Sequence, residues 1–416
     1  MEYRWFYIRE FFQDLKTQKT RAFLTASAIV WGTLSVVLLL AFGQGFKARM
    51  VSGLLNAGDR ILVIYGGQTT KSFQGLPEGR SIHLTPEDEK LLKESLSEID
   101  RISVQYGHWN TQLSHGKKSA ITYAVGVEPS FEMMRRMYPV SGGRFLNAPD
   151  LQQKRRVVVL GSEIANELFG QINPVGQLLT IDGVPFTVIG ILQKKLQTSM
   201  NNGPDSRRAV MPASTFRAIY GRRYVNQIVI RPRNPDVSKK LEQQIRTLLG
   251  RKHRFDPLDS NAIWINSFIE AEKMSRKIFL GIQIFLGIVG GLTLLVAGVG
   301  VANIMFVIVK ERTREIGIKK AIGAKKSQIL SQFIFESVLI TIIGGGVGLF
   351  LAWIIVQATG LLPFDRPPFE YLGKPILNTT IMFLTVFILG LIGLLAGLFP
   401  ARQAARLEPV ESLRYE

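Results

Sequence analysis

The most densely charged part of this 416-residue sequence is a short segment between two uncharged ones. Residues 303–326 continue an apolar run as far as Val309 and then turn into a run of both charge signs. The first charged residues of that run are Lys310, Glu311, Arg312, Arg314 and Glu315. Opposite charges three or four positions apart pair on one face of a helix. The segment is too short to enclose an active site, but its surface suits a partner that pushes on it.

Isoleucines and glycines interrupt the charges of the same segment. Ile316, Ile318 and Ile322 form an apolar stripe, and Gly317 and Gly323 permit a close approach or a turn. An ordinary loop rich in basic residues would contain neither the two glutamates nor this pattern of Ile and Gly. We therefore expect residues 310–326 to be a docking elbow rather than a simple connection.

Patterns for catalysis and metal binding are absent from the sequence. None of the four histidines belongs to an HExxH motif or pairs with another histidine at metal-ligand spacing. The stretch 116–119 lacks the glycine that a phosphate-binding loop needs at the position of Thr111, and there is no GxSxG motif. We predict no catalytic residue, no metal and no cofactor on this chain.

Glu336 is the one charged residue in the long apolar run that follows the elbow. An ionisable residue inside a membrane span is a functional candidate by default. Glu336 falls near the end of its span, so we favour a structural hydrogen bond to a neighbouring helix over a role with substrate or protons.

Four windows of the sequence contain no Asp, Glu, Lys or Arg. They are Ala22–Phe46, Ile278–Val309, Ser337–Phe364 and Pro375–Ala401. Each exceeds the about 20 residues that cross a bilayer core, and lipid cannot satisfy backbone groups, so each window is predicted to be a helix. The predicted fold is an α-helical membrane protein with four transmembrane helices and a large α/β extracytoplasmic domain between helices 1 and 2.

Basic residues flank the predicted spans unevenly. They are frequent in residues 1–21, in the elbow and in the tail, whereas the loop 365–374 contains only Arg366 and Lys374. Because cytoplasmic loops carry the excess of Lys and Arg, we expect both termini and the elbow in the cytoplasm. The net charge is +19, but the basic residues of 47–277 are scattered without a recognition motif, so no nucleic acid is expected. The absence of cysteine excludes disulfides.

Spans, charges and local patterns together predict the domain organisation. The predicted segments are a cytoplasmic amphipathic N-terminal helix (1–21), the first span (22–46), an extracytoplasmic domain of two lobes (47–277), the second span with a stalk (278–309), the coupling elbow (310–326), the third span (327–360), a short outer loop (361–376), the fourth span (377–400) and a cytoplasmic tail (401–416). Within 47–277 we expect strands near 60–65, 119–127, 157–160, 178–181, 185–192 and 225–230, and helices near 85–92, 162–169, 237–249 and 261–277. Residues 193–206 are predicted to be a mobile loop.

Glycines are frequent in the second and third spans. In lipid, small residues let neighbouring helices approach closely. The predicted helix-packing residues are Gly290, Gly291, Gly298, Gly300, Gly344, Gly345 and Gly348.

Several of these motifs resemble one known family. Residues 311–324 resemble the signature after the second span of ABC permeases of the MacB/FtsX/LolCE superfamily, and residues 399–413 resemble its C-terminal pattern. In the outer domain, Gly142–Phe145 before Val157–Gly161, and Asn173–Gln177 before Ile181–Gly190, look like the MacB-type periplasmic core domain. The resemblance covers nearly the whole chain and is weakest at 1–45 and 195–260.

The resemblance implies a transporter permease in the inner membrane, not an enzyme. Such permeases work as dimers and couple cytoplasmic ATP hydrolysis to motion outside, which is called mechanotransmission. The elbow would dock on the ATPase. The implied coupling residues are Glu311, Arg312, Thr313, Arg314, Glu315, Ile316, Gly317, Lys319, Lys320, Ala321, Gly323 and Ala324. Only residues 1–21 precede the first span and no P-loop is present, so we expect a separate ATPase subunit that binds the ATP and Mg.

The family resemblance leaves several transported or regulated targets open. We favour efflux of hydrophobic or amphipathic compounds, or peptides, by a homodimer in contact with membrane lipids, with a periplasmic adaptor and an outer-membrane channel as further partners. Lipoprotein extraction of the LolCE type is an alternative and predicts a heterodimer. A regulator of cell-wall hydrolases of the FtsX type is a third alternative, but the outer domain is large for that role.

Overall fold

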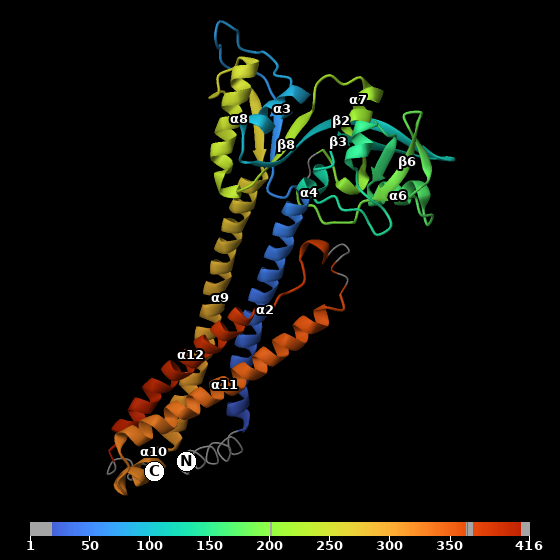
Figure 1. Ribbon diagram of the computed structural model, residues 1–416. Coiled ribbons are helices and arrows are strands. Elements are labelled where there is room, and N and C mark those ends of the chain that lie inside the picture. Colours follow the sequence, from blue (N-terminus) through green and yellow to red (C-terminus); the bar gives the residue numbers. More distant parts are fainter. Residues whose placement is uncertain (1–18, 200–201, 363, 365–368, 409–416) are drawn as a thin grey trace. The chain divides into compact units, whose positions relative to one another are not determined.

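The computed structural model describes residues 19–199, 202–362, 364 and 369–408 (Figure 1). The chain divides into two compact units. The membrane unit comprises residues 1–49 and 278–416, and the outer unit comprises residues 50–277. The predicted N-terminal helix at 1–21 lies almost entirely outside the described residues, and so does the end of the predicted tail.

Four long helices are apolar enough to cross a membrane, which confirms the predicted set of spans. They are α2 (Lys19–Ala57), α9 (Phe268–Glu311), α11 (Lys326–Thr359) and α12 (Thr379–Arg406). The short helices α10 (Thr313–Ala321) and η3 (Phe369–Tyr371) lie in the two connections. A helix satisfies its own backbone groups, which is why uncharged windows of this length form helices.

Small residues bring α11 and α12 close together, side by side in Figure 1. The Ser337 hydroxyl donates to the Gly393 carbonyl at 2.9 Å. A Cβ on Gly393 would lie 2.7 Å from the Thr341 hydroxyl oxygen, closer than real Cβ atoms approach. The pair is thus held by close backbone packing and a hydrogen bond between helices.

The segment 369–378 lies against α2 within the membrane unit. The Ile376 N–H donates to the Ala41 carbonyl at 3.0 Å, and Arg49 Nε donates to the Glu370 carbonyl at 2.9 Å. Gly45 of α2 faces the Lys374 backbone with no room for a side chain. The connection between the third and fourth spans is therefore fastened to the first.

The outer unit is built on a nine-stranded mixed sheet in the order β3-β7-β4-β6-β5-β2-β8-β1-β9. The strands are β1 (Leu62–Gly66), β2 (Ile99–His115), β3 (Lys118–Val127), β4 (Val157–Leu160), β5 (Leu178–Ile181), β6 (Val184–Ile191), β7 (Arg208–Pro212), β8 (Gln227–Pro232) and β9 (Ile263–Ser267). Strand β2 also pairs with β3, so the six strands from β3 to β2 close into a ring and leave no free edge between them.

Short helices cover this sheet. They are α3 (Pro86–Ser95), α4 (Phe131–Arg135), α5 (Ala148–Gln152), α6 (Ser162–Phe169), α7 (Ala213–Tyr220) and α8 (Ser238–His253), with the 3-10 turns η1 (Asp205–Arg207) and η2 (Pro235–Val237). In Figure 1, α3 and α8 lie beside β8, whereas α6 and α7 lie at the other end of the sheet. Helix α3 begins as the sequence predicts, with Thr85 at the N-cap and Pro86 in the first turn; the Thr85 N–H donates to Asp88 Oδ2 at 2.7 Å in a capping box.

Several elements differ from the sequence prediction, which did not include strands β2, β7 and β9 or helices α4, α5 and α7. Residues 263–267, expected to be part of a helix, form strand β9, and α9 begins only at Phe268. The alternation of Ile263 and Ile265 with exposed residues suits an edge strand paired with β1. The 17-residue strand β2 was not predicted at all, because charged residues and a bulge after His108 interrupt its apolar pattern.

Candidate functional site

The elbow folds into a short helix of its own between two candidate spans. Helix α9 ends at Glu311, and Arg312 leaves the helical conformation with φ −94° and ψ 12°. Helix α10 starts at Thr313, whose hydroxyl donates to the Lys310 carbonyl at 2.8 Å. The hydroxyl thus satisfies a carbonyl that the end of α9 leaves open.

The other end of α10 is a Schellman motif. The Gly323 N–H donates to the Lys320 carbonyl at 3.1 Å, and the Ala324 N–H donates to the Lys319 carbonyl at 3.0 Å. Gly323 has a φ of 101°, which side chains strongly disfavour. This explains one of the two glycines that the sequence singles out, because the chain must turn sharply here before α11.

The structure divides the predicted coupling residues between two faces of α10. Thr313, Ile316 and Gly317 are buried, and Ile316 belongs to the apolar core of the membrane unit. The exposed residues are Glu311, Arg314, Glu315, Ile318, Ala321, Ile322 and Gly323. Of the three isoleucines in the expected stripe, Ile318 is 47% exposed and Ile322 81% exposed, so two are available to a partner.

Two basic side chains of the elbow are directed inward, toward other helices. Arg312 Nη1 lies 3.4 Å from Glu336 Oε1 on α11, and Gln332 Nε2 donates to the same oxygen at 3.3 Å. Lys320 Nζ donates to the Ala405 carbonyl at 3.1 Å and also to the Leu407 carbonyl. Glu336 therefore makes the structural contact that the sequence favoured, and Lys320 caps the C-terminal end of α12.

The residues of the elbow therefore have two different roles. Arg312 and Lys320 fix α10 to α11 and α12, and the remaining face presents Arg314 and Glu315 beside the exposed isoleucines. We call the residues Arg314, Glu315, Ile318 and Ile322 the elbow face. Charges of both signs next to apolar groups suit a protein surface better than a small ligand.

The glycines predicted to pack helices lie in different surroundings. A Cβ added to Gly298 or Gly345 would collide with Ile392 or Leu389, and one added to Gly348 would lie 2.8 Å from the Thr33 Cβ. Gly290 faces Val36, and Gly344 faces Ile29. No described atom comes within 4 Å of such a Cβ on Gly291 or Gly300.

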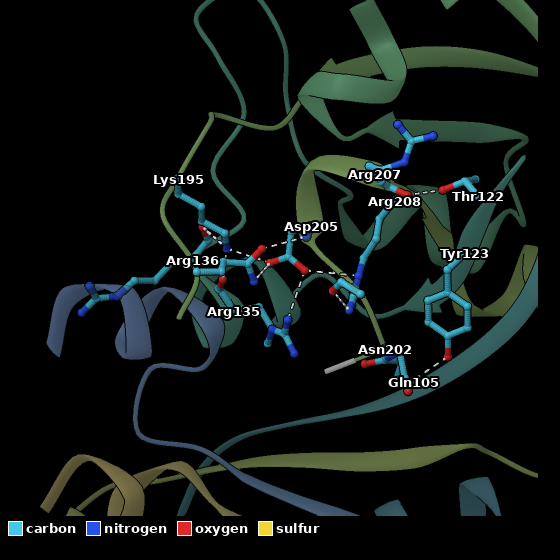
Figure 2. A network of polar contacts seen from close by, with 12 residues as sticks. Gln105, Thr122, Tyr123, Arg135, Arg136, Lys195, Asn202, Asp205, Arg207 and Arg208 are labelled. Atoms are coloured by element: carbon cyan, nitrogen blue, oxygen red, sulfur yellow. Dashed lines mark hydrogen bonds and ion pairs between the residues drawn. The ribbon is translucent and has the colours of Figure 1, made fainter. Parts of the chain in front are cut away.

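The outer unit contains a second concentration of charge, which the sequence did not predict. Figure 2 shows Arg135, Lys195 and Arg208 around the carboxylate of Asp205. The distances from Asp205 oxygens are 3.1 Å to Arg135 Nη2, 2.9 Å to Lys195 Nζ and 3.3 Å to Arg208 Nε. We call these four residues the Asp205 cluster.

Burial distinguishes the Asp205 cluster from a surface ion pair. Arg135 and Arg208 are fully buried, and Asp205 is 1% exposed. Burial alone would raise the pKa of Asp205, but the charges of Arg135, Arg208 and Lys195 hold it below its usual value. Burial lowers the pKa of Lys195 to about 8, against the opposing effect of Asp205. Three cations around one carboxylate leave the cluster with excess positive charge.

Aromatic rings partly compensate that excess. The Arg135 guanidinium lies 5.9 Å from the centre of the Phe131 ring, and that of Arg208 lies 5.7 Å from the Tyr123 ring. Such contacts favour the charged form of arginine inside a protein. The four residues of the Asp205 cluster are well separated in the sequence, except for Asp205 and Arg208. The spacing of three between these two is the signal that the sequence offers for the cluster.

Glu89 and Glu128 form a separate carboxyl pair in the outer unit. Burial, followed by the charge of Glu128, raises the pKa of Glu89 to about 8. Burial also raises the pKa of Glu128. Within the described residues, no group of three or more His, Asp or Glu side chains could hold a metal ion.

The chain is similar to known proteins over nearly its whole length. Residues 22–248 match the family described as "MacB-like periplasmic core domain", and residues 287–409 match "FtsX-like permease C-terminal". The chain is 30% identical over 413 residues to "Macrolide export ATP-binding/permease protein MacB" of Bdellovibrio bacteriovorus, covering 99% of this chain and 62% of that protein. It is 33% identical to "Pyoverdine export ATP-binding/permease protein PvdT" of Pseudomonas syringae pv. syringae, covering 98% of this chain and 59% of that protein.

The chain thus spans about three fifths of the length of the curated relatives it matches. Among solved structures, the periplasmic region of MacB from Actinobacillus actinomycetemcomitans is similar with a TM-score of 0.42 and 20% identity, covering 54% of this chain and 96% of that one.

Proposed function

Because the chain belongs to the family of MacB-like permeases with an FtsX-like C-terminal part, we propose that it is the permease of an ABC transporter whose ATPase acts on α10. The printed sequence contains no P-loop, so ATP hydrolysis is supplied from outside these 416 residues. In this proposal the elbow and both termini are cytoplasmic, and the outer unit is extracytoplasmic. A second permease protomer completes the transporter.

One observation carries the proposal: the elbow face is exposed while the rest of α10 is fastened to two membrane helices. A force applied at Glu315 or Ile322 would pass through the contact between Arg312 and Glu336 to α11. It would also pass through Lys320 to the end of α12. A surface connection without these contacts would bend instead of transmitting the push.

Export is the direction that the curated relatives favour, since their names describe macrolide and pyoverdine export. We propose that this chain also serves efflux, with hydrophobic or amphipathic compounds or peptides as the substrate class. Mechanotransmission fits the few polar side chains in the spans, because a transport path through four helices would need a polar lining.

Cross-linking from the elbow tests the proposal. The chain contains no cysteine, so Ile322→Cys introduces a single reactive thiol at an exposed position of the elbow face. A cleavable photo-cross-linker attached there in native membranes should capture a protein with a P-loop ATPase domain. The matched control is Leu361→Cys, which is 89% exposed in the connection between the third and fourth spans.

The two positions give opposite expectations. An ATPase captured from Ile322→Cys but not from Leu361→Cys supports the proposal. Capture of no ATPase from Ile322→Cys, or equal capture from both positions, contradicts it.

A further inference from the structure

The loop between β6 and η1 contacts the part of α2 that belongs to the outer unit. Asn56 Nδ2 donates to the Leu196 carbonyl at 3.0 Å. The Thr198 N–H donates to the Gly53 carbonyl at 3.3 Å, and the Thr198 hydroxyl donates to the Met50 carbonyl at 3.4 Å. Three hydrogen bonds therefore hold residues 196–198 against one helix.

Gly53 makes this close approach possible. A Cβ at position 53 would lie 2.5 Å from Thr198 Cγ2, which is nearer than real Cβ atoms come to another atom. Any side chain at position 53 would push Thr198 away. The contact between loop and helix therefore depends on the smallest residue.

The same short stretch also reaches the Asp205 cluster. Lys195 is a member of the cluster, and Gln197 Nε2 donates to Asp205 Oδ2 at 3.0 Å. The Asp205 N–H donates back to Gln197 Oε1 at 2.7 Å. Residues 195 and 197 thus face Asp205 while 196 and 198 face α2, as expected where successive residues of an extended segment point to opposite sides.

The Asp205 cluster is in turn anchored in the sheet. Arg208 is the first residue of β7, which pairs with β3 and with β4. Lys195 Nζ also donates to the Arg135 carbonyl at 2.6 Å, at the end of α4. Next along the chain, Arg136 pairs at 3.3 Å with Asp59, which lies just beyond the end of α2.

We propose that residues 195–198 and the Asp205 cluster form a clasp that joins the end of α2 to the half of the sheet containing β7, with Asp205 as its positioning residue. The clasp makes residues 50–57 of α2 and the ring of six strands move as one body. This inference rests on the proposed function and deepens it. If α2 is displaced, the clasp would move the sheet by the same amount, because no flexible loop between them absorbs the motion.

Hydrogen exchange on the full chain in lipid nanodiscs tests the clasp. Asp205→Asn removes the carboxylate charge that faces Arg135, Lys195 and Arg208 while keeping the side-chain size. We expect amide exchange to rise at least about tenfold in residues 195–199 and in residues 50–57, and to stay unchanged in α8. The matched control is Glu167→Gln, which removes a half-exposed ion pair with Arg207 at 3.1 Å and should alter neither segment.

A disulfide between residues 53 and 198 tests whether the contact between loop and helix itself protects residues 50–57 from exchange. A Cβ at position 53 would lie 3.3 Å from the Thr198 Cβ, close to the about 3.5–4.5 Å that a disulfide needs. In the Asp205→Asn background, the pair Gly53→Cys and Thr198→Cys should restore protection of residues 50–57 when oxidised and lose it when reduced. The chain has no other cysteine to interfere.

A second variant serves if Asp205→Asn does not fold. Gly53→Ala leaves every charge of the cluster in place but displaces Thr198, and should raise exchange in both segments. Adding Thr198→Ala to Gly53→Ala should remove the collision with Thr198 Cγ2, but the hydrogen bond from the Thr198 hydroxyl to the Met50 carbonyl stays absent.

Unchanged exchange at residues 50–57 in a folded Asp205→Asn or Gly53→Ala variant would overturn the clasp. So would an oxidised disulfide that fails to restore protection. These measurements need no ATPase and no substrate, so their failure would leave the proposed function standing. Failure of the cross-linking from Ile322→Cys would reject the function and leave the clasp.

Discussion

The elbow and the Asp205 cluster are both rich in charge, but they use it in opposite ways. On the elbow face, Arg314 and Glu315 are exposed to solvent. In the Asp205 cluster, Arg135, Arg208 and Asp205 are buried and Lys195 is partly buried, so removing Asp205 leaves three cations without their counter-charge. Exposed charges contribute little to stability and are available to a partner, whereas buried charges position the elements that carry them.

The elbow also contains a small version of the buried arrangement. Arg312 with Glu336, and Lys320 with the end of α12, are contacts inside the membrane unit. Contact residues on the elbow face and positioning residues in the interior should therefore respond differently to substitution.

The largest effect is expected at Asp205. Asp205→Ala should lower the free energy of unfolding of the outer unit by about 3–5 kcal/mol, because three cations, two of them fully buried, lose their counter-charge. Urea unfolding measures this in the full chain, followed by the fluorescence of Trp109 and Trp264 after Trp5, Trp31 and Trp353 are replaced by Phe in all variants. Glu167→Ala at an exposed ion pair should cost below about 1 kcal/mol. Equal losses of unfolding free energy from Asp205→Ala and Glu167→Ala would contradict the distinction between buried and exposed charges.

The Glu89–Glu128 pair should make stability depend on pH. The folded pKa of Glu89 is about 8, above its ordinary value, so its contribution is fully present below pH 4.5 and is lost as the pH rises through about 8. The free energy of unfolding should fall across this range by up to about 1.4 kcal/mol per pH unit. Glu89→Gln should flatten the profile, and an unchanged profile in that variant would contradict the assignment.

Lys320 tests whether a basic residue of the elbow is structural. Lys320→Met keeps the apolar stem but removes the donor to the carbonyls of Ala405 and Leu407, and should destabilise the membrane unit by about 0.5–1.5 kcal/mol. Thermal melting of the helical circular dichroism in nanodiscs measures the change. Lys326→Met, at an exposed position of α11, is the control and should have the smaller effect.

The smallest stability effect belongs to the elbow face. Glu315→Lys should change the free energy of unfolding by less than about 0.5 kcal/mol, since the side chain is exposed. The same variant should lower capture of the ATPase from Ile322→Cys at least about tenfold through reversed charge. Unimpaired capture would show that Glu315 is not a contact residue, and a large loss of stability would show that it is a positioning residue.

Much of the fold could be predicted from the sequence because its signals are local. Four uncharged windows identify the four spans, and the capping residues at Thr85 and Asp88 identify the start of α3. Strand β2 escaped prediction because its pairing with three other strands, rather than a regular apolar pattern, stabilises it. Strand β9 escaped because its five residues directly precede the long helix α9, and its pairing with β1 is not visible in the sequence.

The candidate site shows the same limit. The sequence by itself determined that the elbow has both charge signs, two glycines and three isoleucines, since these depend only on residue type and order. Only the tertiary structure decided that Ile316 is buried, that Arg312 and Lys320 are directed toward α11 and α12, and that Asp205 meets three cations. Burial and pairing depend on which distant segments the chain brings together, and no local pattern of residues encodes that proximity.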